Sequence, residues 1–69
     1  MFLDTFAWLE YFEGTKKGAL VRERLDAVDV VYTCPMVVAE IASKTLRTHG
    51  EAMMRRRLDF MHERCALID

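Results

Sequence analysis

Two acidic side chains stand in unusual places in this 69-residue sequence. Asp4 ends the short apolar start MFLD and is followed at once by Thr5 and a second, nearly all-apolar stretch. Glu40 stands inside the apolar run VVAEIA. Because a carboxylate is costly to bury unless it is paired, these two acids are the first candidates for chemistry.

Each acid also has an ordinary structural explanation. Asp4 is suited to cap a helix that begins at Thr5, because its carboxylate can accept a hydrogen bond from a backbone N–H of the first turn. Glu40 has Lys44 four residues later, so the two side chains could form a surface ion pair on a helix. These two structural explanations remain open beside the functional one, in which both acids take part in chemistry.

The positions of glycine, proline and apolar residues divide the chain into the elements that must position these acids. They predict short strands over residues 1–4, 30–33 and 66–68. They predict helices over residues 5–12, 15–28, 35–49 and 51–65, with a turn in EGTKKG and His49 at a helix C-terminus. The helix faces expected to be buried carry Leu20, Val21, Leu25 and Val28; Val37, Val38, Ile41, Ala42 and Leu46; and Met54, Leu58, Met61 and Cys65.

The order of these elements, β-α-α-β-α-α-β, favours an α/β fold. Strands joined by helical crossovers are expected to be parallel, with helices on both faces in three α/β/α layers. The strands MFL, VVY and ALI are apolar on both faces, which is typical of a sheet buried on both sides. An all-helical bundle is the alternative.

In such a sheet Asp4 and the first turns of helix 35–49 lie at the same carboxyl edge, where ligands collect in open α/β folds. Two converging carboxylates repel each other unless a cation or a shared proton lies between them. Carboxylate oxygens with an open water shell suit Mg²⁺ or Mn²⁺. The sequence therefore predicts a divalent metal site that contains Asp4 and Glu40.

The composition bounds the class of protein. The chain is 52% hydrophobic and 30% charged, with a net charge of −1, which is typical of one small ordered domain, or of part of one, over residues 1–69. This balance gives no overall attraction to nucleic acid, so any RNA contact must be local. The run Arg55, Arg56, Arg57 is either a solvated helix face or a phosphate contact.

No apolar run approaches the roughly 20 residues that a membrane span needs, and the start lacks a signal peptide's basic region. The spacing of Cys34 and Cys65 fits neither a zinc site nor a disulfide framework, and both are expected to be buried thiols. We therefore expect a cytoplasmic protein without a membrane partner.

Three stretches, DTFAWLEYFEG, TCP and VVAEIASKTLR, resemble the first half of PIN domains, in particular VapC-type toxins of toxin-antitoxin pairs. The resemblance implies a metal-dependent endoribonuclease that hydrolyses RNA phosphodiesters with Mg²⁺ or Mn²⁺, and an antitoxin protein as partner. Asp4 and Glu40 match the first two acids of the family's cluster. The remaining acids of that cluster come from a second half, so the chain is expected to be an amino-terminal part that is inactive alone.

A non-catalytic interaction module is the alternative function. The aromatic residues of helix 5–12 are more often core, yet a short helix that is apolar on most sides leaves some surface for a partner. Trp8, Tyr11 and Phe12 are the candidate partner-binding residues, for an antitoxin or for self-association. The open edge of the first strand is likewise expected to favour a homo-oligomer or pairing with the missing half.

Overall fold

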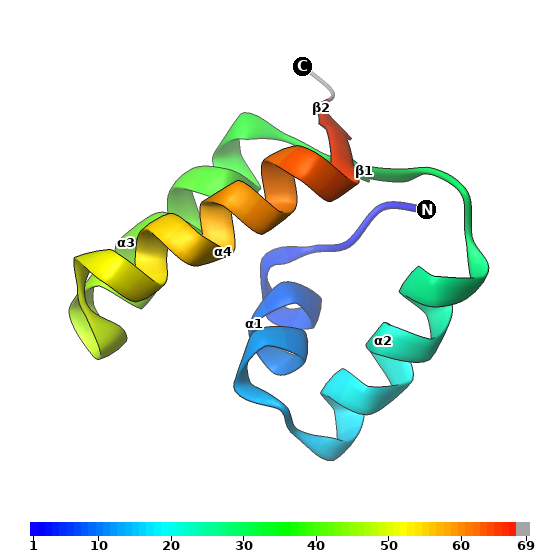
Figure 1. Cartoon of the computed structure of the whole chain (residues 1–69), viewed down its shortest axis with the longest axis horizontal. Coiled ribbons are helices and arrows are strands. Elements are labelled where there is room, and N and C mark those ends of the chain that lie inside the picture. The colour runs from blue at the N-terminus through cyan, green and yellow to red at the C-terminus, as the bar shows by residue number, and fades with distance from the viewer. Residues whose placement is uncertain (68–69) are drawn as a thin grey trace.

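The structure, a computed structural model, describes residues 1–67. The elements follow in the order α1 (Thr5–Glu13), α2 (Lys16–Ala27), β1 (Val31–Thr33), α3 (Pro35–His49), α4 (Glu51–Arg64) and β2 (Cys65–Leu67). Figure 1 shows α1 beside α2 and α3 beside α4, with the strands near the C-terminal end of α4. The four predicted helices are confirmed, each end within one residue. The strands exclude the all-helical alternative.

The strands form a small parallel sheet, as predicted. Val31 lies opposite Cys65 and Thr33 opposite Leu67. On the other side of β1, Phe2 forms an isolated parallel bridge with Tyr32. The predicted strand over residues 1–4 is thus confirmed only as this bridge, and the last strand begins one residue earlier than predicted, at Cys65. Ile68 and Asp69, which the prediction included, lie outside the described residues.

The faces of the sheet differ in burial. Val31 and Thr33 are buried, while Tyr32 between them is exposed. Phe2 and Ala66, which pair with Tyr32 on either side, are exposed as well. Within residues 1–67 one face is therefore covered and the other open, so burial on both faces is not confirmed and the three-layer arrangement stays a prediction.

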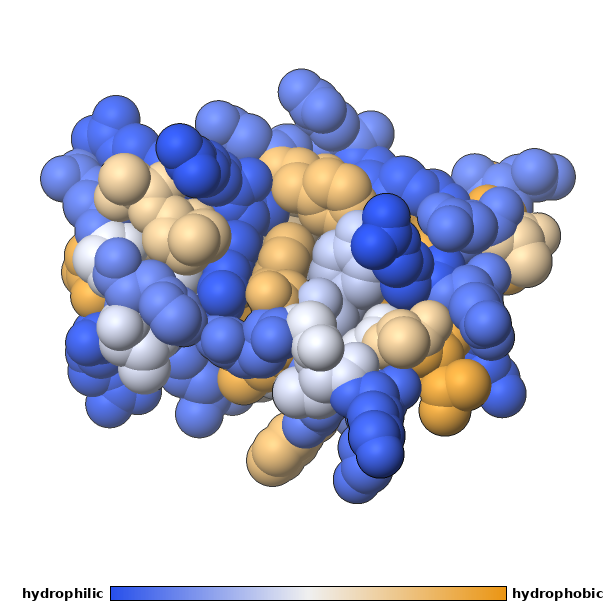
Figure 2. All heavy atoms as spheres, turned by 60° about the horizontal axis from the view of Figure 1, so that its bottom comes forward, coloured by the Kyte–Doolittle hydropathy of each residue, from blue (hydrophilic) through white to orange (hydrophobic). Residues whose placement is uncertain are grey.

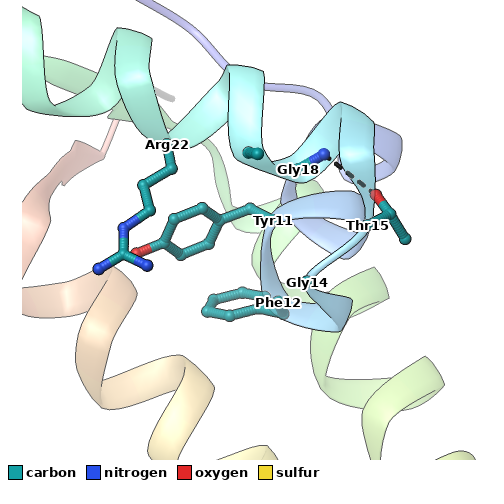
Figure 3. A pocket seen from close by; sticks show the side chains of 7 residues that line it. Tyr11, Phe12, Gly14, Thr15, Gly18 and Arg22 are labelled. Carbon is teal, nitrogen blue, oxygen red and sulfur yellow. Dashed lines mark hydrogen bonds between the residues drawn. The ribbon is translucent and has the colours of Figure 1, made fainter.

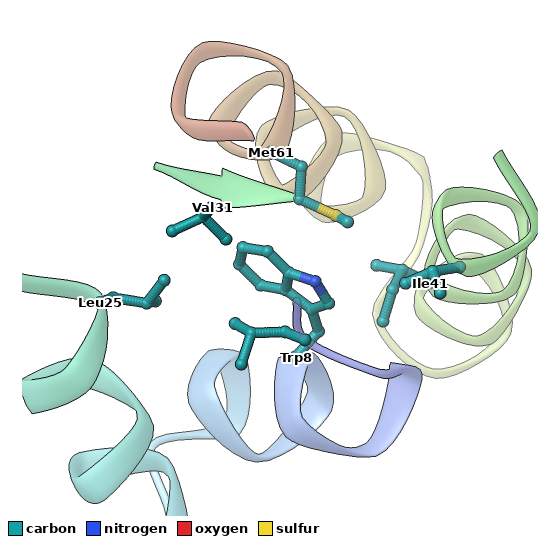
Figure 4. Close-up of a cluster of buried hydrophobic side chains, with 7 residues drawn as sticks. Trp8, Leu25, Val31, Ile41 and Met61 are labelled. Atoms are coloured by element: carbon teal, nitrogen blue, oxygen red, sulfur yellow. The ribbon is translucent and has the colours of Figure 1, made fainter. Parts of the chain in front are cut away.

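The core lies where the helices meet the covered face of the sheet. Figure 4 shows the Trp8 indole among Leu25, Val31, Ile41 and Met61, which come from α2, β1, α3 and α4. These five side chains are at most 2% exposed. The prediction that Leu25, Ile41 and Met61 point inward is confirmed.

Two leucines predicted to be buried are exposed. Leu20 is 61% exposed and Leu46 is 50% exposed. Along α3 the buried line is Val37, Ile41 and Thr45, at intervals of four residues, so Leu46 lies about 100° around the helix from this line. Helix periodicity gave the correct helix here, but the facing elements decided which stripe was covered.

Gly18 belongs to α2 and is buried, so it lies in the helix predicted over residues 15–28 and not in the turn EGTKKG, to which the prediction also assigned it. The turn itself is made by Gly14, whose φ of 71° is left-handed and lets its N–H reach the carbonyls that end α1. At Gly18 a Cβ atom would lie 2.0 Å from the backbone oxygen of Glu10. The missing side chain therefore lets α2 cross close to α1.

The prediction that the whole arginine run lies on the outer face of α4 is wrong for Arg57. Arg55 and Arg56 are exposed, but Arg57 is buried and shares the inward side of the helix with Met61. A buried guanidinium requires partners, and the structure supplies them from α1 and α3.

None of the helices in residues 1–67 is long and apolar enough to span a membrane.

Candidate functional site

Asp4 is the N-cap of α1. It has extended backbone angles, and its Oδ1 atom accepts a hydrogen bond of 2.8 Å from the Ala7 N–H. The capping explanation is therefore confirmed. The side chain is exposed, and no hydrogen bond from residues 1–67 reaches its second oxygen, Oδ2. Capping and metal binding are compatible at this residue because they use different lone pairs.

The sheet register places Asp4 at the carboxyl edge. Phe2 is bridged in parallel to Tyr32, so Asp4 and Cys34 each lie two residues beyond the bridge in the same direction. Cys34 is the N-cap of α3, and Pro35 is its first residue. The starts of α1 and α3 thus lie at the same edge, as the fold prediction required.

Glu40 is exposed on the second turn of α3. Val37 and Ile41 point into the core, whereas the Glu40 side chain lies on the outer side of the helix. Within the described part of the chain Glu40 forms no ion pair, and the alternative pairing with Lys44 is not seen. Its carboxylate is available to a ligand.

The donor set fits a hydrated divalent ion. Mg²⁺ is commonly held by one or two carboxylates while it keeps several waters, and both acids offer exposed oxygens. Among residues 1–67 no three His, Cys, Asp or Glu side chains are grouped to hold a metal. The binding of one metal ion by Asp4 and Glu40 together therefore stays a prediction.

The candidate partner residues of α1 differ in accessibility. Trp8 is fully buried, with its ring stacked on Phe12 at a centroid distance of 5.5 Å. Tyr11 and Phe12 are half-buried, and Tyr11 stacks on Phe60 of α4 at 5.6 Å. The Trp8 indole is a packing element, so a partner surface here would use Tyr11 and Phe12.

A polar network that sequence reasoning missed joins three helices beside these rings. Arg57 Nη2 donates to Glu13 Oε1 at 3.2 Å, and Arg57 Nη1 donates to Thr45 Oγ1 at 3.2 Å. His49 Nε2 lies 2.8 Å from the same Glu13 oxygen. The hydrogen bond with His49 and the nearby Arg57 lower the pKa of Glu13, against partial burial. No local signal predicts this contact, since Glu13 and Arg57 are 44 residues apart.

A second arginine of α4 holds the end of α2. Arg64 Nη2 donates to the backbone oxygens of Leu25 and Val28, which have no partner within their own helix. Cys34 and Cys65 are free thiols and both are half-buried, so their predicted full burial is not confirmed. Burial raises the pKa of Cys65, and the charge of Arg64 opposes this.

These features define a class: a small α/β domain with parallel strands and exposed carboxylates on helices that start at the carboxyl edge. The family model described as PIN domain matches residues 1–69, and the chain belongs to the PIN domain family. PIN domains are generally nucleases and generally depend on a divalent metal. No curated protein and no solved structure matches the chain.

Proposed function

We propose that the chain is part of a Mg²⁺- or Mn²⁺-dependent endoribonuclease of the VapC type, acting on RNA in the cytoplasm as the toxin of a toxin-antitoxin pair. The observation that carries the proposal is the exposed Asp4 carboxylate at the carboxyl edge of the sheet in a PIN domain. Glu40, exposed and without an ion-pair partner in residues 1–67, supports it.

In this proposal Asp4 and Glu40 hold the metal and α1 fixes the position of Asp4 through its cap. The ion, when bound, supplies positive charge to the phosphodiester and a more acidic water. Two carboxylates hold a hydrated ion weakly, and orienting both the ion and the attacking water requires further ligands. We therefore propose that residues 1–69 alone have little or no cleavage activity.

Metal binding tests the site without relying on cleavage. Titration with Mn²⁺, followed by electron paramagnetic resonance, should show one weak site that is lost in Asp4→Asn and in Glu40→Gln. The matched controls are Asp26→Asn and Glu23→Gln, which remove exposed acids of α2. Equal Mn²⁺ affinity in the site variants and the controls would contradict the assignment of both ligands.

A second candidate function is partner binding through α1 and α2. Phe6 is 78% exposed on α1, and a hollow of about 370 Å³ is lined by Phe6, Ala7, Glu10, Lys17 and Val21. Figure 2 shows several separate apolar patches on one face of the molecule. We propose that an antitoxin or a second copy of the chain binds this apolar surface of α1, while Tyr11 and Phe12 line other hollows.

Self-association is tested by light scattering over a range of protein concentrations. A dimer that is lost in Phe6→Ser, with an unchanged circular dichroism spectrum, would support the proposal. Leu46→Ser is the control, because Leu46 is also exposed but lies on α3. A monomer at every concentration would exclude self-association and leave the antitoxin, whose binding the same two variants would test.

A further inference from the structure

The structure separates the three consecutive arginines of α4. Arg55 forms an ion pair of 2.8 Å with Glu51, and Arg57 is buried against Glu13. Arg56 is exposed and has no hydrogen bond or ion pair within residues 1–67. Of the run that sequence analysis left open as a phosphate contact, Arg56 is thus the member available to an anionic ligand.

Arg56 borders a hollow of about 260 Å³ that is lined by aromatic rings. Tyr11, Phe12 and Phe60 form its aromatic wall, and Met53 and Arg57 complete the lining. A second hollow, of about 370 Å³, lies against the same Tyr11 and Phe12 and runs between α1 and α2. Figure 3 shows Arg22 of α2 on this side, with its guanidinium beside the hydroxyl end of Tyr11.

The charged side chains that line these two hollows are arginines: Arg22 in one, and Arg56 and the paired Arg57 in the other. Arg22 is exposed and, like Arg56, has no hydrogen bond or ion pair within residues 1–67. Within residues 1–67 no carboxylate lines either hollow, although Glu13 bonds to the lining residue Arg57 and Glu10 to the lining residue Thr15. Because the net charge of the whole chain is −1, this positive surface is a local feature and not a reflection of the composition. We name it the Arg22–Arg56 surface, with Tyr11 at its centre.

We propose that the Arg22–Arg56 surface binds the backbone of single-stranded RNA, with phosphates at the two guanidinium groups. Guanidinium groups bind phosphate oxygens well, and aromatic side chains beside them offer apolar contact to sugars and bases. RNA is favoured over an acidic peptide because the chain belongs to a nuclease family, whose substrates are polyanions. The inference rests on the proposed function and adds a binding region to it.

This surface is separate from the candidate metal site. Asp4 caps the N-terminus of α1, whereas Tyr11 and Phe12 lie in its last turn. At 1.5 Å per residue the separation along the helix is about 11 Å. An RNA strand that contacts both regions would be positioned by phosphate contacts without being read for sequence.

The test measures binding of a fluorescent single-stranded oligoribonucleotide by anisotropy in EDTA, so that cleavage plays no part. In Arg22→Gln/Arg56→Gln we expect the affinity at low salt to fall by about 5- to 10-fold, from the loss of two exposed charge contacts. The slope of log affinity against log salt should fall by about 1.4, for two phosphates on a single strand. Arg22→Lys/Arg56→Lys should retain most of the binding.

The matched control is Arg24→Gln/Arg55→Gln, which removes the same charge from the same two helices but leaves both hollows unchanged. An equal loss in both double variants, or no loss in either, would overturn the proposal, as would absence of RNA binding by the wild-type chain. Binding of a poly-aspartate peptide as tight as that of RNA would reassign the surface to a protein partner. Failure of the metal site would appear instead in the Mn²⁺ titration, which these arginines do not affect.

Discussion

The buried guanidinium of Arg57 donates to the half-exposed carboxylate of Glu13 at 3.2 Å, and this contact joins the middle of α4 to the end of α1. Arg57 is 5% exposed and also lies 5.1 Å from the centre of the Phe12 ring. The pair therefore links α1 to α4 beside the core that the two helices share.

Removing Arg57 should destabilise the fold more than removing the charge of Glu13. Arg57→Ala loses two hydrogen bonds and the packing of the side chain, at about 3 kcal/mol, while Glu13→Gln should cost about 1 kcal/mol because the carboxylate is partly hydrated. Urea denaturation measures both. The exposed neighbour variant Arg56→Ala is the control, and a loss in it as large as in Arg57→Ala would contradict this account.

Acid should weaken the fold through Glu13. Its pKa is lowered in the folded state, first by the hydrogen bond with His49 and then by Arg57. A lowered carboxyl pKa stabilises the fold above the unfolded value of about 4.3 and loses this contribution as pH falls through the folded value. The urea midpoint of the wild type should therefore fall more between about pH 6 and about pH 3 than that of Glu13→Gln. Parallel curves would exclude Glu13 as the cause.

Gly18→Ala should separate α1 from α2. The new Cβ atom would meet the backbone oxygen of Glu10 at 2.0 Å, and backbone atoms cannot move aside as a flexible side chain can. We expect a loss of about 2 kcal/mol from this overpacking, although alanine favours a helix over glycine. Thermal unfolding measures the loss. Ala19→Ser, at the exposed next residue, is the control, and a Gly18→Ala protein as stable as wild type would show that the helices do not pack this closely.

Substitutions at Asp4 should separate its role as the cap of α1 from its proposed role as a metal ligand. Asn keeps an oxygen that can accept from the Ala7 N–H, so Asp4→Asn should keep the stability of α1, whereas Asp4→Ala should lose about 1 kcal/mol. Both should abolish metal-dependent RNA cleavage by the protein that carries this domain. Undiminished cleavage in Asp4→Asn would remove Asp4 from the proposed site.

Arg64 should stabilise the end of α2. Replacing it with Met keeps most of the apolar stem but leaves the oxygens of Leu25 and Val28 without their donor. Hydrogen exchange should then become faster in the last turn of α2 than in α3. Arg24→Met, an exposed change in the same turn, is the control. Unchanged exchange in α2 would mean that the contact adds no stability.

Local patterns in the sequence determined the helices and the position of the candidate acid. The cap at Asp4, the proline at the start of α3 and the glycines at Gly14 and Gly50 act within a few residues, so their effects can be read directly. The parallel direction of the strands followed from the helical crossovers. For these reasons the sequence alone predicts that Asp4 lies at the carboxyl edge of the sheet.

The tertiary structure decided which side of each element is covered. Leu46 is exposed and Thr45 buried because Arg57 lies across from Thr45, 12 residues away in sequence. Gly18 is buried because α1 passes against it. Within residues 1–67 Arg56 has no ion pair, while Arg55 and Arg57 on either side are paired, since helix rotation places Arg57 toward Glu13. Contacts between distant segments set these outcomes, and periodicity in one segment carries no information about its neighbour.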